Sequence, residues 1–339
     1  MNGLDIGKTY LITGGAGFIG YHLSKSLLEK GAAVIGFDNL NDYYDVSLKK
    51  DRLAVLKQYE HYTFIKGNLA EKSDVFRLFQ EYHPQVVVNL GAQAGVRYSI
   101  DNPDAYMQSN VMGFFHILEG CRYFPVEHLV YASSSSVYGG NEKVPFSTQD
   151  KVDEPVSLYA ATKKSNELMA YAYSRLYRIP VTGLRFFTVY GPYGRPDMAY
   201  FKFTKKIMEG EPIQIYNKGD MYRDFTYIDD IVKGIVEVMQ RSPLSNEDGV
   251  RYKVYNIGNN KPENLLDFVE ILQEELKAAK VLPQDYDFEQ HKELVGMQPG
   301  DVEVTYADVE ELEKDFGFKP STSLRDGLKK FAQWYRNYQ

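Results

Sequence analysis

The sequence contains little cysteine and no long hydrophobic run. Cys121 is the single cysteine among 339 residues, which excludes an internal disulfide and fits a reducing compartment. The first residues lack the apolar region of a signal peptide, and no apolar run reaches the roughly 20 residues that a membrane span needs. We therefore expect a cytoplasmic protein that makes no membrane contact.

Positive charge and metal-ligand patterns are also scarce. The formal net charge of −7 offers no general attraction to a phosphate polymer, which argues against nucleic acid as a partner. The six histidines are scattered, and no His/Cys spacing matches a metal site. We expect neither nucleic acid nor a metal ion to bind.

Strand-like and helix-like segments alternate through the first part of the chain. Apolar strand patterns fall at residues 8–13, 33–37, 62–66, 85–89, 128–131 and 181–187. Such alternation is typical of an α/β fold with a doubly wound parallel (Rossmann) sheet. We expect a Rossmann domain over residues 1–187, to which a strand and helix near 226–258 return. A smaller, mixed α/β substrate-binding domain is expected mainly over residues 188–339.

The first predicted strand runs into Gly14, Gly17 and Gly20, which are spaced three residues apart. The pattern G-x-x-G-x-x-G between a strand and a helix is a variant of the dinucleotide-binding fingerprint. Glycines allow a tight turn and close approach to a pyrophosphate, and the helix N-terminus adds N–H donors. We predict that this loop, with Phe18 and Ile19, binds a dinucleotide; an ordinary turn is the alternative.

The second predicted strand ends at Asp38, 18 residues after Gly20. An acidic residue near this position hydrogen-bonds the adenosine ribose in dinucleotide-binding folds. Because its charge repels a 2′-phosphate, we expect NAD rather than NADP; a solvated carboxylate at a strand end is the alternative. The remaining predicted cofactor positions lie at this strand end and the next two: Asn39, Asn68, Leu69, Leu90 and Ala92.

Two further patterns carry candidate chemistry. A strand at 128–131 leads into four serines, residues 133–136, where ligands gather in parallel sheets. Tyr159 and Lys163 lie four residues apart and share one helical face. An ammonium group beside a phenol lowers a pKa that starts near about 10, which creates a base for a hydroxyl proton. A polar loop and a chance spacing are the respective alternatives.

Taken in this order, the motifs resemble the extended short-chain dehydrogenase/reductase family over nearly the whole chain. The resemblance implies that Ser134, Tyr159 and Lys163 are catalytic and that NAD lies across the sheet. Lys163 is then also expected to hold the nicotinamide ribose. The resemblance further implies a homodimer that pairs through helices at 104–122 and 158–177.

Within that family, residues 37–49, 92–97 and 297–301 are similar to the UDP-glucuronate 4-epimerases. Thr188 and Gln298 stand where the related UDP-galactose 4-epimerases carry asparagine and arginine. The resemblance implies reversible C4 epimerisation of UDP-glucuronate to UDP-galacturonate through a 4-keto sugar. The substrate-binding residues expected on this basis are Arg97, Ser134, Ser135, Ser136, Tyr159, Thr188, Arg195, Arg223 and Asp301.

Three other functions remain to be weighed against this one. Nucleotide-sugar lyases on the same scaffold, such as 4,6-dehydratases and UDP-glucuronate decarboxylases, typically carry a carboxylate beside the catalytic Ser or Thr. Ser135 and Ser136 occupy those positions here and favour an epimerase. A UDP-glucose/UDP-galactose 4-epimerase is a further alternative. A non-enzymatic NAD-binding regulator would have lost Tyr159 or Lys163, and both are present.

Overall fold

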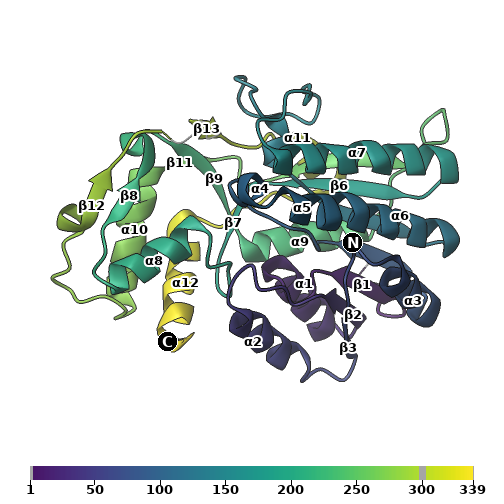
Figure 1. The fold of residues 1–339 in the computed structure, drawn as a ribbon, viewed down its shortest axis with the longest axis horizontal. Coiled ribbons are helices and arrows are strands. Elements are labelled where there is room, and N and C mark those ends of the chain that lie inside the picture. The colour runs from purple at the N-terminus through teal and green to yellow at the C-terminus, as the bar shows by residue number, and fades with distance from the viewer. Residues whose placement is uncertain (1–2, 298–302, 339) are drawn as a thin grey trace.

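The computed structural model describes residues 3–297 and 303–338. Its larger sheet has seven parallel strands in the order β10-β6-β5-β4-β1-β2-β3 (Figure 1). The strands are β1 (Thr9–Thr13), β2 (Ala33–Asp38), β3 (Tyr62–Lys66), β4 (Val86–Asn89), β5 (His128–Ser134), β6 (Val181–Phe186) and β10 (Tyr252–Ile257). The chain reverses its direction across the sheet between β1 and β4, which confirms the predicted doubly wound α/β fold.

Helices cover both faces of this sheet (Figure 1). One face carries α1 (Phe18–Glu29), α2 (Val46–Leu56) and α9 (Ile228–Met239). The other carries α3 (Lys72–Tyr82), α6 (Gly113–Tyr123) and α7 (Leu158–Tyr177). The parallel strands are therefore buried on both sides, as such sheets require.

Alternate side chains of the central strands enter two different cores. Ile12 and Val34 belong to a cluster on the α1 face, whereas Leu11 and Ile35 belong to a cluster on the α6 face. This division follows from the two-residue period of a strand. It explains why the strands are continuous apolar runs in the sequence and not alternating patterns.

A second lobe begins where β6 ends. Its main sheet has the order β11-β9-β13, with β7 also paired to β9, and a separate pair joins β12 to β8. These strands are β7 (Thr188–Tyr190), β8 (Ile213–Ile215), β9 (Tyr222–Tyr227), β11 (Pro262–Asn264), β12 (Lys292–Leu294) and β13 (Val304–Thr305). The accompanying helices are α8 (Ala199–Met208), α10 (Leu265–Ala278), α11 (Glu310–Phe316) and α12 (Leu324–Tyr338).

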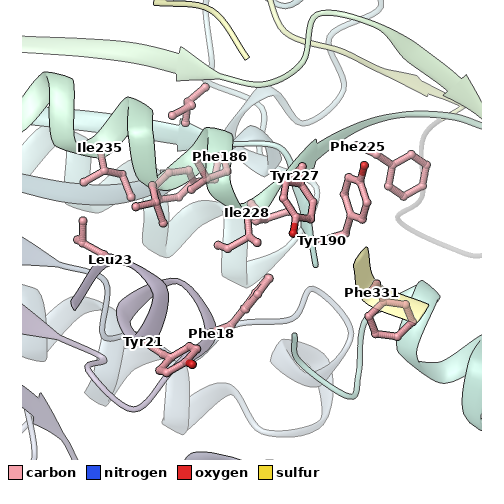
Figure 2. Packing of buried hydrophobic residues seen from close by; sticks show 14 of the residues in the cluster. Phe18, Tyr21, Leu23, Phe186, Tyr190, Phe225, Tyr227, Ile228, Ile235 and Phe331 are labelled. Carbon is pink, nitrogen blue, oxygen red and sulfur yellow. The ribbon is translucent and has the colours of Figure 1, made fainter. Parts of the chain in front are cut away.

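One hydrophobic core runs through both lobes. Phe18 and Leu23 from α1 belong to the same buried cluster as Tyr190, Phe225 and Phe331 from the second lobe (Figure 2). Because β6 ends at Phe186 and β7 begins at Thr188, the second lobe starts at the carboxyl edge of the large sheet. That edge is where ligands bind in open parallel sheets.

Some elements depart from the sequence patterns. Helix α2 has no apolar stripe, because Lys49 and Arg52 on its inward side are buried. The helix expected at 104–122 is divided into α5 (Pro103–Tyr106), the π-helical η1 (Met107–Met112) and α6. The remaining short helices are α4 (Tyr98–Asp101), η2 (Ser135–Tyr138), η3 (Tyr216–Gly219) and η4 (Phe288–His291). Within the described ranges, no helix is both long and apolar enough to cross a bilayer.

Candidate active site

A cavity lies at the carboxyl edge of the large sheet, where the strand order reverses. Every predicted cofactor position lines it: Gly14, Gly17, Phe18, Ile19, Gly20, Asp38, Asn39, Asn68, Leu69, Leu90, Ala92 and Lys163. Ser134, Tyr159 and Arg195 line the same cavity. The structure thus brings residues from the ends of six strands, β1 to β6, and the start of α7 together around one space.

The glycine loop after β1 is shaped for close contact with an anion. Gly14 has a φ of +65°, and a Cβ at Gly20 would lie 2.1 Å from the carbonyl oxygen of Gly14. Gly17 precedes α1 and has no side chain to cap the first N–H groups of the helix. Those donors and the positive end of the helix dipole suit a pyrophosphate. The loop therefore fits the phosphates of a dinucleotide.

Asp38 at the end of β2 is buried and surrounded by donors. Its carboxylate accepts from the backbone N–H of Leu40 at 2.8 Å and of Ala16 at 3.2 Å. The Nζ of Lys49 lies 3.6 Å from Oδ1 of Asp38 and donates to Oδ1 of Asn41 at 2.9 Å. Asp38 and Lys49 both line the cavity, so they fit the place of an adenosine ribose.

Ser134, Tyr159 and Lys163 meet through β5 and α7. Ser134 is the last residue of β5, and Tyr159 lies in the first turn of α7, which Ser157 caps by accepting from the N–H of Ala160 at 3.1 Å. Ser134 and Tyr159 line the same cavity, where the Ser134 hydroxyl acts to lower the pKa of Tyr159. Lys163 is buried, and its Nζ donates to the carbonyl oxygen of Ala132 at 2.9 Å.

Burial governs the proton affinities of the two titratable members of this group. It raises the pKa of Tyr159, while the Ser134 hydroxyl and the charge of Arg195 act to lower it. Burial also lowers the pKa of Lys163 to about 8. The Nζ of Lys163 lies 6.0 Å from the centre of the Tyr159 ring. Among the charged side chains, Arg195 acts to lower the pKa of Tyr159, and an effect of Lys163 on this phenol stays a prediction.

The other predicted substrate residues of the large sheet's edge lie beside the cavity lining. Ser135 and Ser136 begin η2, and the hydroxyl of Ser134 donates to Oγ of Ser136 at 3.2 Å. Thr188 begins β7, two residues after Phe186, which is the sheet partner of Ser134. Hydroxyl groups from two neighbouring strand ends therefore lie next to the catalytic candidates.

The predicted basic residues occupy three different surroundings. Arg195 lines the cavity and pairs with Asp197. Arg97 is exposed, with its guanidinium 5.2 Å from the centre of the Tyr216 ring in the second lobe. Arg223 on β9 donates to the carbonyl oxygen of Glu303 at 3.0 Å. Asp301 and Gln298 lie outside the described residues.

Several residues that sequence patterns did not reveal also contribute to the site. Tyr43 and Lys49 line the cavity, and Asp197 holds Arg195. Glu167 lies four residues after Lys163 on α7 and forms a buried ion pair with Arg185 at 2.8 Å. Its spacing from Tyr159 and Lys163 was one signal in the sequence, and the resemblance of residues 37–49, which contain Tyr43 and Lys49, was another. Among the residues that the structure describes, no group of three or more His, Cys, Asp or Glu side chains could hold a metal ion.

Comparison with known proteins places this geometry in a family. Residues 11–331 match the family described as GDP-mannose 4,6 dehydratase. The chain belongs to this family, which is part of the extended short-chain dehydrogenases/reductases.

Individual relatives are similar over their whole length. Protein CapI of Staphylococcus aureus is 52% identical, with 97% of this chain and 98% of that protein covered. A probable UDP-glucuronate 4-epimerase of Rhizobium meliloti (strain 1021) is 44% identical, with the same two shares covered. The crystal structure of UDP-glucuronic acid 4-epimerase from Bacillus cereus with UDP-glucuronic acid and NAD is 31% identical, with a TM-score of 0.86. That match covers 98% of this chain and 100% of the other.

The lowered pKa of Lys163 predicts a pH-dependent stability. In protein free of dinucleotide, the folded chain releases this proton near pH 8, whereas the unfolded chain retains it to about pH 10.5. Relative to Lys163→Met, wild type should therefore gain about 3 kcal/mol of unfolding free energy as pH rises through this window. Urea unfolding at pH 7.5 and pH 10.5 measures the difference, with Lys164→Met as matched control. A difference that does not change with pH would contradict the burial effect.

Proposed function

We propose that the chain catalyses the reversible C4 epimerisation of UDP-glucuronate and UDP-galacturonate with bound NAD. The observation that carries this proposal is the end of β5, where Ser134 meets Tyr159 and is followed by hydroxyl groups and no carboxylate. The relatives named UDP-glucuronate 4-epimerase and the structure containing UDP-glucuronic acid and NAD support it.

The cavity fits NAD by its donors and by its charge. The glycine loop offers N–H groups for the pyrophosphate, and Asp38 offers a carboxylate for the adenosine ribose. When bound, NAD supplies reversible oxidation at C4 of the sugar, so no second substrate is consumed. We assign residues 1–187 and 226–258 to cofactor binding and most of 188–339 to the nucleotide sugar.

Tyr159 and Ser134 are assigned to proton transfer at the C4 hydroxyl. Tyr159 as phenolate accepts this proton during oxidation and returns it during reduction, while Ser134 hydrogen-bonds the same oxygen. Because burial alone raises the pKa of Tyr159, its function as a base depends on Ser134 and on nearby positive charge. Lys163 supplies positive charge at pH values below about 8.

The carboxylate of the sugar requires separate control. The 4-keto intermediate is a β-keto acid, and it loses CO₂ when the carboxylate-bearing bond stands perpendicular to the plane of the ketone. Ser135, Ser136 and Thr188 offer neutral donors that hold the carboxylate in another orientation. Arg195, in the loop after β7, offers a charged donor at the cavity wall.

The nucleotide must stay anchored while the sugar turns. Arg223 is assigned to the diphosphate because a guanidinium matches phosphate oxygens in pairs. Asp301 is assigned to the uridine ribose. Arg97, whose guanidinium lies beside Tyr216 of the second lobe, is assigned to substrate binding. Strong binding at UDP and looser binding at the sugar together allow the 4-keto group to present its other face.

A lyase reaction is the second candidate, favoured by the name of the matched family and by the similarity to a solved dTDP-glucose 4,6-dehydratase. Dehydration or decarboxylation needs a group that transfers a proton at C5 or C6. Ser135 and Ser136, beside Ser134, have no acidic side chain at neutral pH. The composition of this strand end therefore supports the epimerase over the lyase.

Incubation of the purified protein with UDP-glucuronate, followed by NMR, tests the function. UDP-galacturonate is expected as the main product, and Tyr159→Phe should lower kcat by at least about a hundredfold because the proton acceptor is lost. Dinucleotide content and thermal unfolding of Tyr159→Phe serve as controls for folding. A 4-keto sugar or a decarboxylated sugar as the main product would reject the proposal.

Cofactor choice can be tested at Asp38. In Asp38→Asn the charge that repels a 2′-phosphate is lost, while the ammonium of Lys49 remains, so NADPH affinity should rise about tenfold or more. In the double variant Asp38→Asn/Lys49→Met, the NADPH affinity should return close to the wild-type value, because the ammonium group is lost as well. Titration followed by nicotinamide fluorescence measures both cofactors. Unchanged NADPH affinity in Asp38→Asn would remove Asp38 as the discriminating group.

We also assign a homodimer and a cytoplasmic location to the protein. Exposed apolar side chains gather on the neighbouring segments α4, η1 and α7: Ile100, Met107, Met112, Leu168 and Tyr171. A patch of this kind typically marks an interface.

The buried single thiol of Cys121 supports a reducing compartment, which cell fractionation would check.

Charge placed in this patch should separate the subunits. Leu168→Glu, at a side chain that is 60% exposed, should shift the protein from dimer to monomer in sedimentation velocity. Leu244→Glu, at a side chain that is 92% exposed outside the patch, is the matched control and should stay dimeric. A wild-type monomer, or a Leu168→Glu dimer, would contradict the assignment.

A further inference from the structure

We propose that Asp197 and Tyr43 are positioning residues that fix the guanidinium of Arg195 at the sugar and thereby keep the oxidised uronic acid from losing CO₂. This inference rests on the proposed epimerase function and goes one step beyond it. It concerns two residues that do not themselves react with the substrate. Tyr43 lies between β2 and α2 of the first lobe, and Asp197 lies between β7 and α8 of the second.

Arg195 is held by Asp197 as a planar, two-pronged pair. Its Nε donates to Oδ1 of Asp197 at 2.9 Å, and its Nη2 donates to Oδ2 at 2.5 Å. The hydroxyl of Tyr43 donates to the same Oδ2 at 3.2 Å. The Arg195 and Asp197 side chains are 24% and 22% exposed, so the pair is largely shielded from water.

Arg52 also joins the segments that carry Tyr43 and Asp197, because it donates to the hydroxyl of Tyr44, next to Tyr43, at 2.8 Å. Its fully buried guanidinium donates to the carbonyl oxygens of Tyr193 and Gly194, just before Arg195, and to that of Ala16 in the glycine loop. The loop after β7 is therefore tied to the cofactor side of the cavity. Residues 37–49, singled out by their resemblance to the epimerases, supply Tyr43 to this arrangement.

This arrangement leaves Arg195 oriented and still able to bind an anion. A guanidinium has five N–H donors, and the contacts with Asp197 use two of its nitrogen atoms. Tyr43, Arg195 and Tyr159 all line the cavity. A fixed guanidinium plane matters because bidentate contact with a carboxylate depends on orientation. Asp197 also offsets part of the arginine's charge before substrate binds.

A loosened Arg195 would change the fate of the 4-keto acid. If the C5–C6 bond turns perpendicular to the plane of the ketone, that bond breaks and C6 leaves as CO₂. The electron pair of that bond forms the enolate of the C4 ketone, and a proton from water then adds at C5. The product is a UDP-4-keto-pentose, and bound NAD from the preceding oxidation at C4 remains reduced. No further oxidant is required.

The test compares product ratios in variants of the holoenzyme supplied with UDP-glucuronate. Asp197→Asn removes the charge of the pair, Asp197→Glu restores it, and Tyr43→Phe removes a single hydroxyl. Tyr98→Phe is the matched control, because the Tyr98 ring packs 4.8 Å from Tyr43 and its hydroxyl bonds to Asn102. Released CO₂, UDP-4-keto-pentose and UDP-galacturonate are measured together with kcat and KM.

Asp197→Asn should raise the ratio of decarboxylated to epimerised product about tenfold or more and lower kcat, with KM nearly unchanged because the UDP site is intact. Tyr43→Phe should shift the ratio in the same direction by a few-fold, Asp197→Glu should largely restore it, and Tyr98→Phe should match wild type. If wild type epimerises but Tyr43→Phe and correctly folded Asp197→Asn keep its product ratio, the positioning role is overturned. If wild type makes no UDP-galacturonate, the proposed function itself fails.

Discussion

Strand β5 and helix α7 are joined by buried charged groups, and the rest of the site depends on this joint. Lys163 donates to the carbonyl oxygen of Ala132, while Glu167 accepts from the hydroxyl of Ser133 at 2.7 Å. The Glu167 carboxylate also accepts two hydrogen bonds from the guanidinium of Arg185 on β6, from Nε and from Nη2. Because these contacts hold Ala132 and Ser133, the two residues that precede Ser134 in β5, they fix the Ser134 hydroxyl relative to Tyr159. The cost of removing both charges from water offsets much of the attraction in a buried ion pair, so the pair of Glu167 and Arg185 contributes little net stability. Its contribution is to hold β5, β6 and α7 in a fixed orientation.

In the second lobe, buried polar contacts likewise fix a side chain that faces the substrate. A shared apolar core joins the two lobes, and the loop that carries Arg195 is tied to the cofactor side by Arg52. The reacting sugar would therefore be bounded by hydroxyl groups at one strand end and by a held guanidinium at the cavity wall. A 4-keto uronic acid needs such control, because its carboxylate must not align for loss of CO₂ while the sugar turns.

Sequence patterns predicted the parallel sheet, because it follows from local periodicity. The cofactor positions expected at its strand ends all line one cavity. Helix α2 was not predicted, since Lys49 and Arg52 face inward and mask its pattern. The contact of Tyr43 with Asp197 joins residues 154 positions apart, and one sequence holds no record of such a pairing. The effect of burial on the pKa of Tyr159 likewise depends on the folded surroundings.

The central claim is that one hydrogen atom leaves C4 and returns to C4 on the opposite face within one active site. UDP-glucuronate carrying deuterium at C4, converted in ordinary water and examined by mass spectrometry, tests it most directly. The account predicts UDP-galacturonate that retains the deuterium at C4. Loss of the deuterium to water during conversion, at a rate comparable with epimerisation, would contradict it.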